Sequence, residues 1–190
     1  MSSRRPAGVL LTPGAGTGCD HRTLVAIEEG LAPLPVRRVD FPYRREGRKA
    51  PDRAPKLVAA VVAEAEAFAA ELGVGTDRLV LGGRSMGGRM CSMAVAEGLP
   101  AAGLVLLSYP LHPPAKPERL RTEHLPALTV PCLFVGGDRD PFGTPDEITA
   151  ATATIPGPVT HVWLEGQRHD PKPALDAEIV VAVQRWLAGL

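Results

Sequence analysis

The 190-residue sequence has no excess of charge of either sign, because 21 Lys and Arg residues balance 21 Asp and Glu residues. A formal net charge of zero provides no general electrostatic attraction to nucleic acid or to an anionic membrane surface, so we expect neither as a partner. Apolar residues make up 45% of the sequence and charged residues 22%, which is typical of an ordinary globular domain.

A hydrophobic run long enough to cross a bilayer is also missing. The longest apolar-rich segment, LVAAVVAEAEAFAAEL, contains three glutamates and is shorter than the roughly 20 residues that a transmembrane helix needs. The apolar run near the N-terminus is too short for the hydrophobic region of a secretory signal. We therefore expect no membrane anchor and no secretory leader.

Cysteine is scarce. Cys19, Cys91 and Cys132 form an odd, widely spaced set without a CxxC pair. This pattern favours reduced thiols that serve as packing residues, and with them a cytoplasmic location. An HEXXH motif and a Cys/His ligand cluster are both absent from the sequence, so it indicates no metal and no cofactor.

The order of apolar segments predicts the fold class. Apolar stripes with helical spacing occur within residues 57–72 and 175–186. Buried strands are expected at 9–12, 36–41, 79–81, 104–108, 132–135 and 159–164. Alternation of strands and helices predicts one α/β domain over residues 1–190, with a mostly parallel sheet of about six or seven strands and helices on both faces. Residues 42–55 are expected to form a surface loop.

A possible nucleophile follows the third expected strand, in the segment GGRSMGGRM. Residues 83–87 match G-x-S-x-G, the nucleophile elbow, in the strand–turn–helix context that this motif requires. Glycine relieves crowding in so sharp a turn. We predict that Ser85 is a nucleophile at a helix N-terminus and that the Met86 N–H is an oxyanion donor. The alternative is an N-cap serine between glycines that allow close packing.

A nucleophilic serine needs a general base and an orienting carboxylate, which follow it in the order acid, then histidine. His169 lies in a turn just beyond the last expected strand, and we predict that it is the base. The other four histidines do not fit: His161, for example, lies inside that strand. Asp138 and Asp140 both follow the fifth strand, and Asp140 is favoured because a turn before proline can aim it back.

Three glycines follow the first expected strand, in VLLTPGAGTGCDHRTL. A P-loop requires a Gly-Lys pair that is absent here, and a dinucleotide fingerprint requires glycine where the chain has Cys19. Both nucleotide-binding interpretations therefore fail. In α/β-hydrolases, the enzymes in which the G-x-S-x-G motif occurs, a loop after an early strand supplies the second oxyanion N–H. Ala15 is the expected donor, with Gly16 as the second choice.

Two further segments have two interpretations each. The proline-rich segment SYPLHPPAKPERL follows the fourth expected strand, so that Tyr109, Leu111 and His112 either line a substrate pocket or belong to a rigid structural loop. A basic segment is either a solvated surface, which we favour, or a device that steers an anionic substrate. It contains Arg44, Arg45, Arg48, Lys49 and Arg53.

Together these motifs resemble a known family. The blocks that carry the resemblance are TPGAG, FPYRREGRKAPDRAPK, LGGRSMGGRM, LSYPLHPPAKPERLRTEHL and VGGDRDPFG. They are similar to the α/β-hydrolase-like family related to testis-expressed protein 30 and the third subunit of the NSL acetyltransferase complex, which is akin to the dienelactone hydrolases. The resemblance implies a single-domain α/β-hydrolase fold and triad positions at Ser85, Asp140 and His169.

The expected activity is that of a serine hydrolase. The connection from the fourth to the fifth strand is short, polar and rich in proline, so we expect no large cap and a preference for small or short-acyl esters over lipids. A non-catalytic interaction protein on the same fold is one alternative, because fold alone does not establish function. An acyltransferase that uses the same acyl-enzyme is another. The sequence leaves the oligomeric state open.

Overall fold

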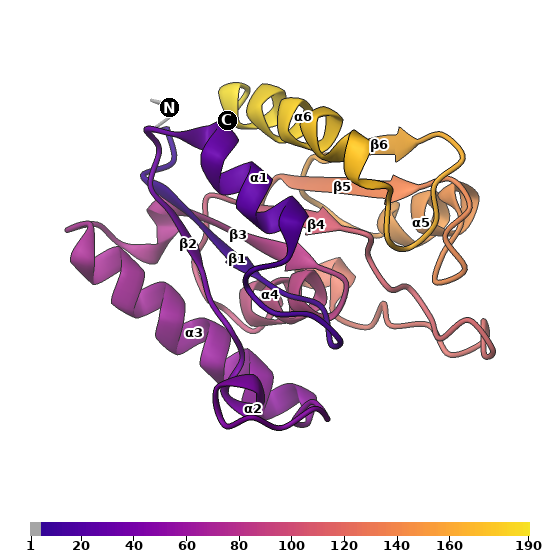
Figure 1. Cartoon of the computed structure of the whole chain (residues 1–190), viewed down its shortest axis with the longest axis horizontal. Helices are drawn as coiled ribbons and strands as arrows, with labels where there is room; N and C mark the ends of the chain where they lie inside the picture. The colour runs from indigo at the N-terminus through magenta and orange to yellow at the C-terminus, as the bar shows by residue number, and fades with distance from the viewer. Residues whose placement is uncertain (1–4) are drawn as a thin grey trace.

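The computed structural model describes residues 5–190. Its centre is one sheet of six strands in the order β2-β1-β3-β4-β5-β6, and each neighbouring pair is parallel (Figure 1). The strands are β1 (Gly8–Thr12), β2 (Val36–Arg38), β3 (Leu79–Arg84), β4 (Gly103–Leu107), β5 (Cys132–Gly137) and β6 (Val159–Leu164). The expected α/β fold with a parallel sheet is confirmed.

Helices cover both faces of the sheet (Figure 1). One face carries α1 (Arg22–Leu31) and α6 (Asp176–Ala188). The other carries α3 (Ala54–Glu71), α4 (Met86–Ala96) and α5 (Pro145–Thr152). Short helical turns complete the chain: α2 (Pro42–Arg45), η1 (Thr76–Arg78), η2 (Leu125–Ala127) and η3 (Pro173–Leu175).

Alternate residues of the strands supply two separate cores. Leu104 and Leu106 of β4 pack into the core under α3 and α4, whereas Val105 and Leu107 pack into the core under α1 and α6. Successive side chains of a strand point to opposite faces of a sheet. Because helices cover both faces, the strands are continuously apolar rather than alternating.

Two expected boundaries are corrected by the structure. Strand β2 ends at Arg38 and not at residue 41, and the Asp40 carboxylate just beyond it accepts the Cys19 N–H at 2.8 Å. The expected surface loop over residues 42–55 opens with α2, in which Tyr43 is fully buried. The start of this segment is therefore helical and Tyr43 belongs to the core, whereas Arg45 and residues 46–51 are exposed.

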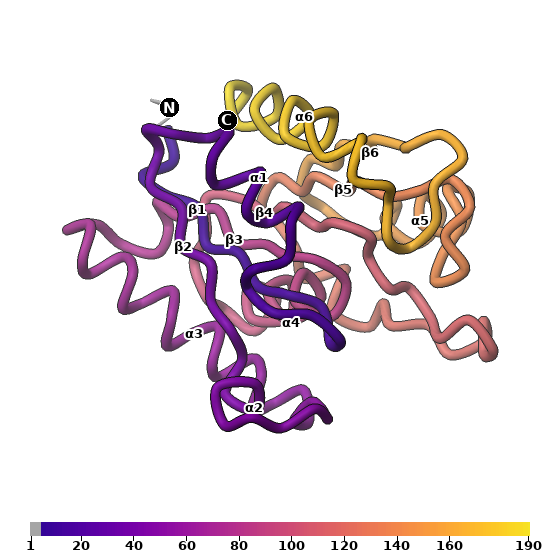
Figure 2. Tube along the Cα trace, viewed as in Figure 1, coloured from indigo at the N-terminus to yellow at the C-terminus, as the bar shows by residue number. Residues whose placement is uncertain are grey.

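The parallel sheet brings the functional loops to one edge. The carboxyl ends of parallel strands lie together, which is where ligands bind in such sheets. The connection from β4 to β5 has η2 as its single helical turn within the described residues, and Figure 2 shows it as an extended trace. Among residues 5–190, no helix combines the length and apolarity needed to span a bilayer.

Candidate active site

The backbone at Ser85 forms a sharp turn between β3 and α4. Its φ of 51° and ψ of −119° lie outside the usual regions for a side-chain-bearing residue. Gly83 and Gly87 make the turn possible. A Cβ at Gly83 would lie 2.1 Å from the Thr12 carbonyl oxygen, and one at Gly87 would lie 2.5 Å from the same atom. The structure therefore has the strand–turn–helix geometry that the motif predicts.

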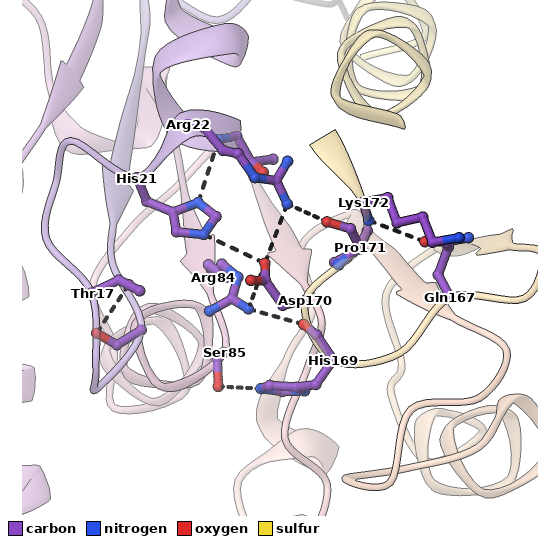
Figure 3. A network of polar contacts seen from close by, with 12 residues as sticks. Thr17, His21, Arg22, Arg84, Ser85, Gln167, His169, Asp170, Pro171 and Lys172 are labelled. Atoms are coloured by element: carbon purple, nitrogen blue, oxygen red, sulfur yellow. Dashed lines mark hydrogen bonds and ion pairs between the residues drawn. The ribbon is translucent and has the colours of Figure 1, made fainter. Parts of the chain in front are cut away.

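Three side chains from three loops form a continuous chain of contacts. The Ser85 Oγ lies 2.8 Å from Nε2 of His169, as Figure 3 shows. Nδ1 of the same imidazole lies 2.8 Å from Oδ2 of Asp140. The structure thus brings together the three residues that the sequence predicts as nucleophile, base and acid.

Burial and packing fix the acid and the imidazole. The Asp140 residue is only 3% exposed, and its Oδ1 accepts the Phe142 N–H at 2.8 Å. The Phe142 ring packs on the imidazole of His169, with 4.0 Å between ring centroids. Asp138 lies elsewhere: within residues 5–190 its buried Oδ1 has no hydrogen-bond partner. The geometry therefore favours Asp140 over Asp138.

A buried arginine anchors the histidine loop, and sequence reasoning missed it. The Arg84 guanidinium donates to the His169 carbonyl oxygen at 3.0 Å and pairs with Asp170 at 3.1 Å. Burial lowers the pKa of Arg84. Figure 3 shows that His21 and Arg22 converge on the same carboxylate, at 3.5 and 3.3 Å. The only sequence signal was an arginine beside the nucleophile, with Asp170 beside the base.

The loop after β1 lies against the nucleophile. A Cβ at Gly14 would be 3.5 Å from the Ser85 Cβ, so this loop covers one side of the serine. The Tyr43 hydroxyl donates to the Ala15 carbonyl oxygen at 3.0 Å and thereby fixes the loop. Met86 is the first residue of α4, where a backbone N–H has no acceptor within the helix. Ala15, Gly16 and Met86 all face one cavity with Ser85.

That cavity measures about 490 Å³ and opens beside the serine and the histidine. Apart from the loop after β1, its wall includes apolar residues and two cationic side chains that sequence reasoning did not identify. These residues are Leu57, Met90, Pro110, Phe142, Arg89 and Arg121. The cavity is therefore large enough for a small organic molecule and combines apolar walls with positive charge.

The proposed lining by Tyr109, Leu111 and His112 is not what the structure shows. These residues are 4%, 1% and 4% exposed, and they do not contribute to the cavity wall. Tyr109 packs edge-on against Phe134, with 5.6 Å between ring centroids. The His112 N–H donates to the Phe142 carbonyl oxygen at 3.1 Å. Tyr109, Leu111 and His112 thus have a structural role because their side chains turn back into the core, whereas Pro110 of the same segment lines the cavity.

The basic segment and the cysteines have structural surroundings. Arg44 lies 3.6 Å from Asp40, and Arg48 pairs with Asp52 at 3.0 Å. Since carboxylates already partner these cations, the solvated-surface interpretation is the stronger one.

The three cysteines are free thiols, and burial raises the pKa of Cys91 and of Cys132 to about 12. Two of the three thiols are therefore inert packing groups.

Comparison with known proteins agrees with this architecture. The sequence profile of the alpha/beta hydrolase domain matches residues 5–181. Est1E from Butyrivibrio proteoclasticus has a similar structure, with a TM-score of 0.72, 16% identity and coverage of 100% of this chain and 91% of that chain. For TT1662 from Thermus thermophilus the TM-score is 0.71 at 19% identity, with 97% and 90% coverage.

A third similar structure is that of an alpha-beta serine hydrolase homologue from Coxiella burnetii. Its TM-score is 0.69 at 16% identity, and the match covers 96% of this chain and 86% of that chain. At these identities the structural matches establish the fold, whereas the sequence profile spans nearly all of the chain. The chain belongs to the alpha/beta hydrolase family.

Proposed function

We propose that the protein is a serine hydrolase that cleaves small or short-acyl carboxylic esters through an acyl-enzyme. The observation that carries this proposal is the unbroken chain of two contacts, each 2.8 Å long, from the Ser85 Oγ through the imidazole of His169 to the Asp140 carboxylate. This chain lies at a cavity that can admit a small ester. Such an arrangement activates a serine for acyl transfer.

The first step transfers the acyl group to the enzyme. The Ser85 hydroxyl donates its proton to Nε2 of His169 while Oγ attacks the ester carbonyl carbon. The Asp140 carboxylate accepts the Nδ1–H, which keeps Nε2 free to accept that proton and then stabilises the imidazolium. The imidazolium gives the proton to the departing alkoxide. The same histidine then takes a proton from water, whose oxygen attacks the acyl carbon. The imidazolium returns this proton to the Ser85 Oγ as the bond from Oγ to the acyl carbon breaks and the acid is released.

Backbone N–H groups stabilise the tetrahedral intermediate. In this proposal the Met86 N–H, at the start of α4, and the Ala15 N–H, with Gly16 as the second choice, donate to the oxyanion. Removal of one donor of this type typically costs about 3 kcal/mol of transition-state stabilisation. The hydrogen bond from Tyr43 to the Ala15 carbonyl supports this role, because it holds the loop against the serine.

The strained serine backbone argues against a purely structural role for the site. Holding the backbone of a residue other than glycine in the conformation of Ser85 destabilises the folded state by roughly 1–3 kcal/mol. A scaffold protein gains nothing from such a conformation, and it needs no histidine aligned with a buried aspartate. An acyltransferase would use the same groups, with an alcohol in place of water.

Narrower assignments also belong to this proposal. The sequence blocks around Ser85 and in the loops after β1, β4 and β5 support a relationship to the family of testis-expressed protein 30 and NSL complex subunit 3. Free thiols support a cytoplasmic location. The expected partner is a small ester, with neither nucleic acid nor membrane involved, and no metal or cofactor takes part in the proposed steps.

A burst experiment tests the proposed reaction. Mixing the protein with p-nitrophenyl acetate should release p-nitrophenol in a rapid phase of about one equivalent, followed by slower turnover as the acyl-enzyme is hydrolysed. Ser85→Ala should remove both phases, and a circular dichroism spectrum should verify that the variant is folded. Turnover by folded Ser85→Ala at the wild-type rate would overturn the proposal. Adding methanol and analysing products separates hydrolysis from acyl transfer.

A further inference from the structure

Besides Arg84, two arginines line the cavity beside the nucleophile, and they take no part in the proposed acyl transfer. Arg89 lies on α4 one turn after the serine, and its backbone N–H donates to the Ser85 carbonyl oxygen at 3.1 Å. Arg121 comes from the connection between β4 and β5. The two cations therefore reach one cavity from different segments of the chain.

Neither arginine forms an ion pair with a carboxylate within residues 5–190. The Nε atom of Arg89 is buried and has no hydrogen-bond partner in that part of the chain. The Arg121 guanidinium donates to a neutral acceptor, the Pro110 carbonyl oxygen, at 3.3 Å. Both arginines are half-buried, and charged groups partly withdrawn from water are normally paired, as Arg44, Arg45 and Arg48 of the basic segment are.

The carboxylates near the cavity already have other partners. Asp52 also lines the cavity, but it pairs with Arg48 at 3.0 Å and with Lys56 at 3.2 Å. Asp140 contacts the imidazole of His169. Glu123 acts electrostatically on the neighbouring Tyr109 and His124, but among the described residues it forms no ion pair with either arginine. Burial and the charge of Arg89 lower the pKa of Arg121.

Partly buried hydrogen bonds hold the second arginine, Arg121, in place. The Tyr109 hydroxyl donates to the Arg121 carbonyl oxygen at 3.0 Å, and the backbone N–H of Arg121 donates to the Leu111 carbonyl oxygen at 2.9 Å. His124 Nε2 lies 2.8 Å from the hydroxyl of Ser92, a buried residue of α4. The connection is therefore pinned to the helix that carries Arg89, which gives the buried Tyr109 a clear role.

We propose that Arg89 and Arg121 form a subsite for an anionic group of the substrate, a carboxylate or a phosphate-type group. The inference rests on the proposed function and narrows it: the preferred substrate is a small ester that also carries a negative charge. Guanidinium groups suit this task because their planar donors match the oxygens of such anions and remain charged at all physiological pH values.

Matched ester pairs test the subsite. On the acyl side, mono-p-nitrophenyl adipate is compared with p-nitrophenyl hexanoate, and a phosphonate analogue of the adipate separates the two kinds of anion. On the alcohol side, 4-acetoxybenzoate is compared with its methyl ester. We expect wild-type kcat/KM to be roughly 10- to 100-fold higher for at least one anionic member than for its neutral partner, the gain typical of a charge-assisted pair.

Variants connect the preference to the residues. Arg89→Met and Arg121→Met should each lower the ratio of anionic to neutral kcat/KM by roughly tenfold, and Arg121→Lys should retain part of it. Arg119→Met is the matched control: this arginine is exposed on the same connection, outside the cavity wall, and its loss should leave the ratio unchanged. A wild-type ratio at or below one for every pair, or a ratio insensitive to both variants, would overturn the subsite.

A binding measurement separates this inference from the catalytic proposal. Monomethyl adipate and methyl hexanoate are titrated calorimetrically into Ser85→Ala, which needs no turnover. Tighter binding of the anion, lost when Arg89→Met or Arg121→Met is added, supports the subsite even if the wild-type protein hydrolyses no ester. Equal binding of the two ligands contradicts the subsite, even if hydrolysis of neutral esters is demonstrated.

Discussion

The guanidinium of Arg84 donates a hydrogen bond to the His169 carbonyl oxygen at 3.0 Å. Arg84 is the last residue of β3, whereas His169 lies in the loop after β6. The arginine directly precedes the proposed nucleophile, and the carbonyl belongs to the proposed base. One buried side chain thus connects the nucleophile turn to the histidine loop. We therefore expect Arg84 to be a positioning residue, which would act through the backbone of His169.

Arg84→Met should lower kcat for a neutral ester by roughly 10-fold or more, because small displacements of a catalytic group can cost up to about 100-fold. KM should change much less, and Arg84→Lys should recover part of the activity through its charge. Arg37→Met is the control, because the ion pair of Arg37, with Glu71, does not involve the histidine loop. An Arg84→Met enzyme with wild-type kcat, or with a defect confined to KM, contradicts this role.

Asp140→Asn should lower kcat by about four orders of magnitude with the fold intact, because the amide favours the wrong imidazole tautomer. Asp138→Asn should have a far smaller effect, since Asp138 does not contact His169 within the described residues. Steady-state kinetics on p-nitrophenyl acetate give both values. The reverse ranking would show that the acid has been assigned to the wrong residue.

The buried His124 makes stability depend on pH. Burial and the charge of Arg89 lower its pKa from 6.5 to about 4. Below pH 6.5 the unfolded chain takes up a proton that the folded protein does not bind until about pH 4. The free energy of unfolding therefore falls as the pH is lowered from 6.5 to about 4. Urea unfolding should show a flatter decline for His124→Gln, whose amide can still reach Ser92. Equal slopes for the two proteins would refute the buried neutral histidine.

Short acyl chains should be preferred. Each buried methylene contributes about 0.8 kcal/mol, but a cavity of about 490 Å³ without a cap cannot cover a long chain. Values of kcat/KM for p-nitrophenyl esters from acetate to palmitate should therefore stop rising by about eight carbons. A steady increase beyond that length would contradict this expectation, because it requires an apolar groove longer than the cavity that the described residues form beside Ser85.

The sheet and the three contacting side chains were predictable from local patterns. Apolar runs marked the strands, and Ser85, Asp140 and His169 each follow a strand, so a parallel sheet brings them to one edge. Tyr109 was misplaced for the same reason: it also follows a strand. The chain turns at Ser108, where φ is 47°, and the Tyr109 ring enters the core instead of the cavity.

Arg84 and Arg121 could not have been identified from local sequence patterns. Arg84 acts through a carbonyl group 85 positions away, and no residue pattern records that contact. Arg121 reaches the cavity because partly buried hydrogen bonds of Tyr109 and His124 fold its connection onto α4. These placements depend on tertiary packing of an irregular segment, for which helical or strand periodicity gives no signal.

The central claim is that Ser85 is a reactive nucleophile, and covalent labelling tests it most directly. The folded wild-type protein is incubated with a fluorophosphonate probe, digested and analysed by mass spectrometry, with Ser85→Ala and Asp138→Asn treated in parallel. We expect one adduct, on the peptide that contains Ser85, in the wild-type and Asp138→Asn proteins and none in Ser85→Ala. A folded wild-type protein that stays unlabelled, or a Ser85→Ala protein labelled as strongly as wild type, would contradict it.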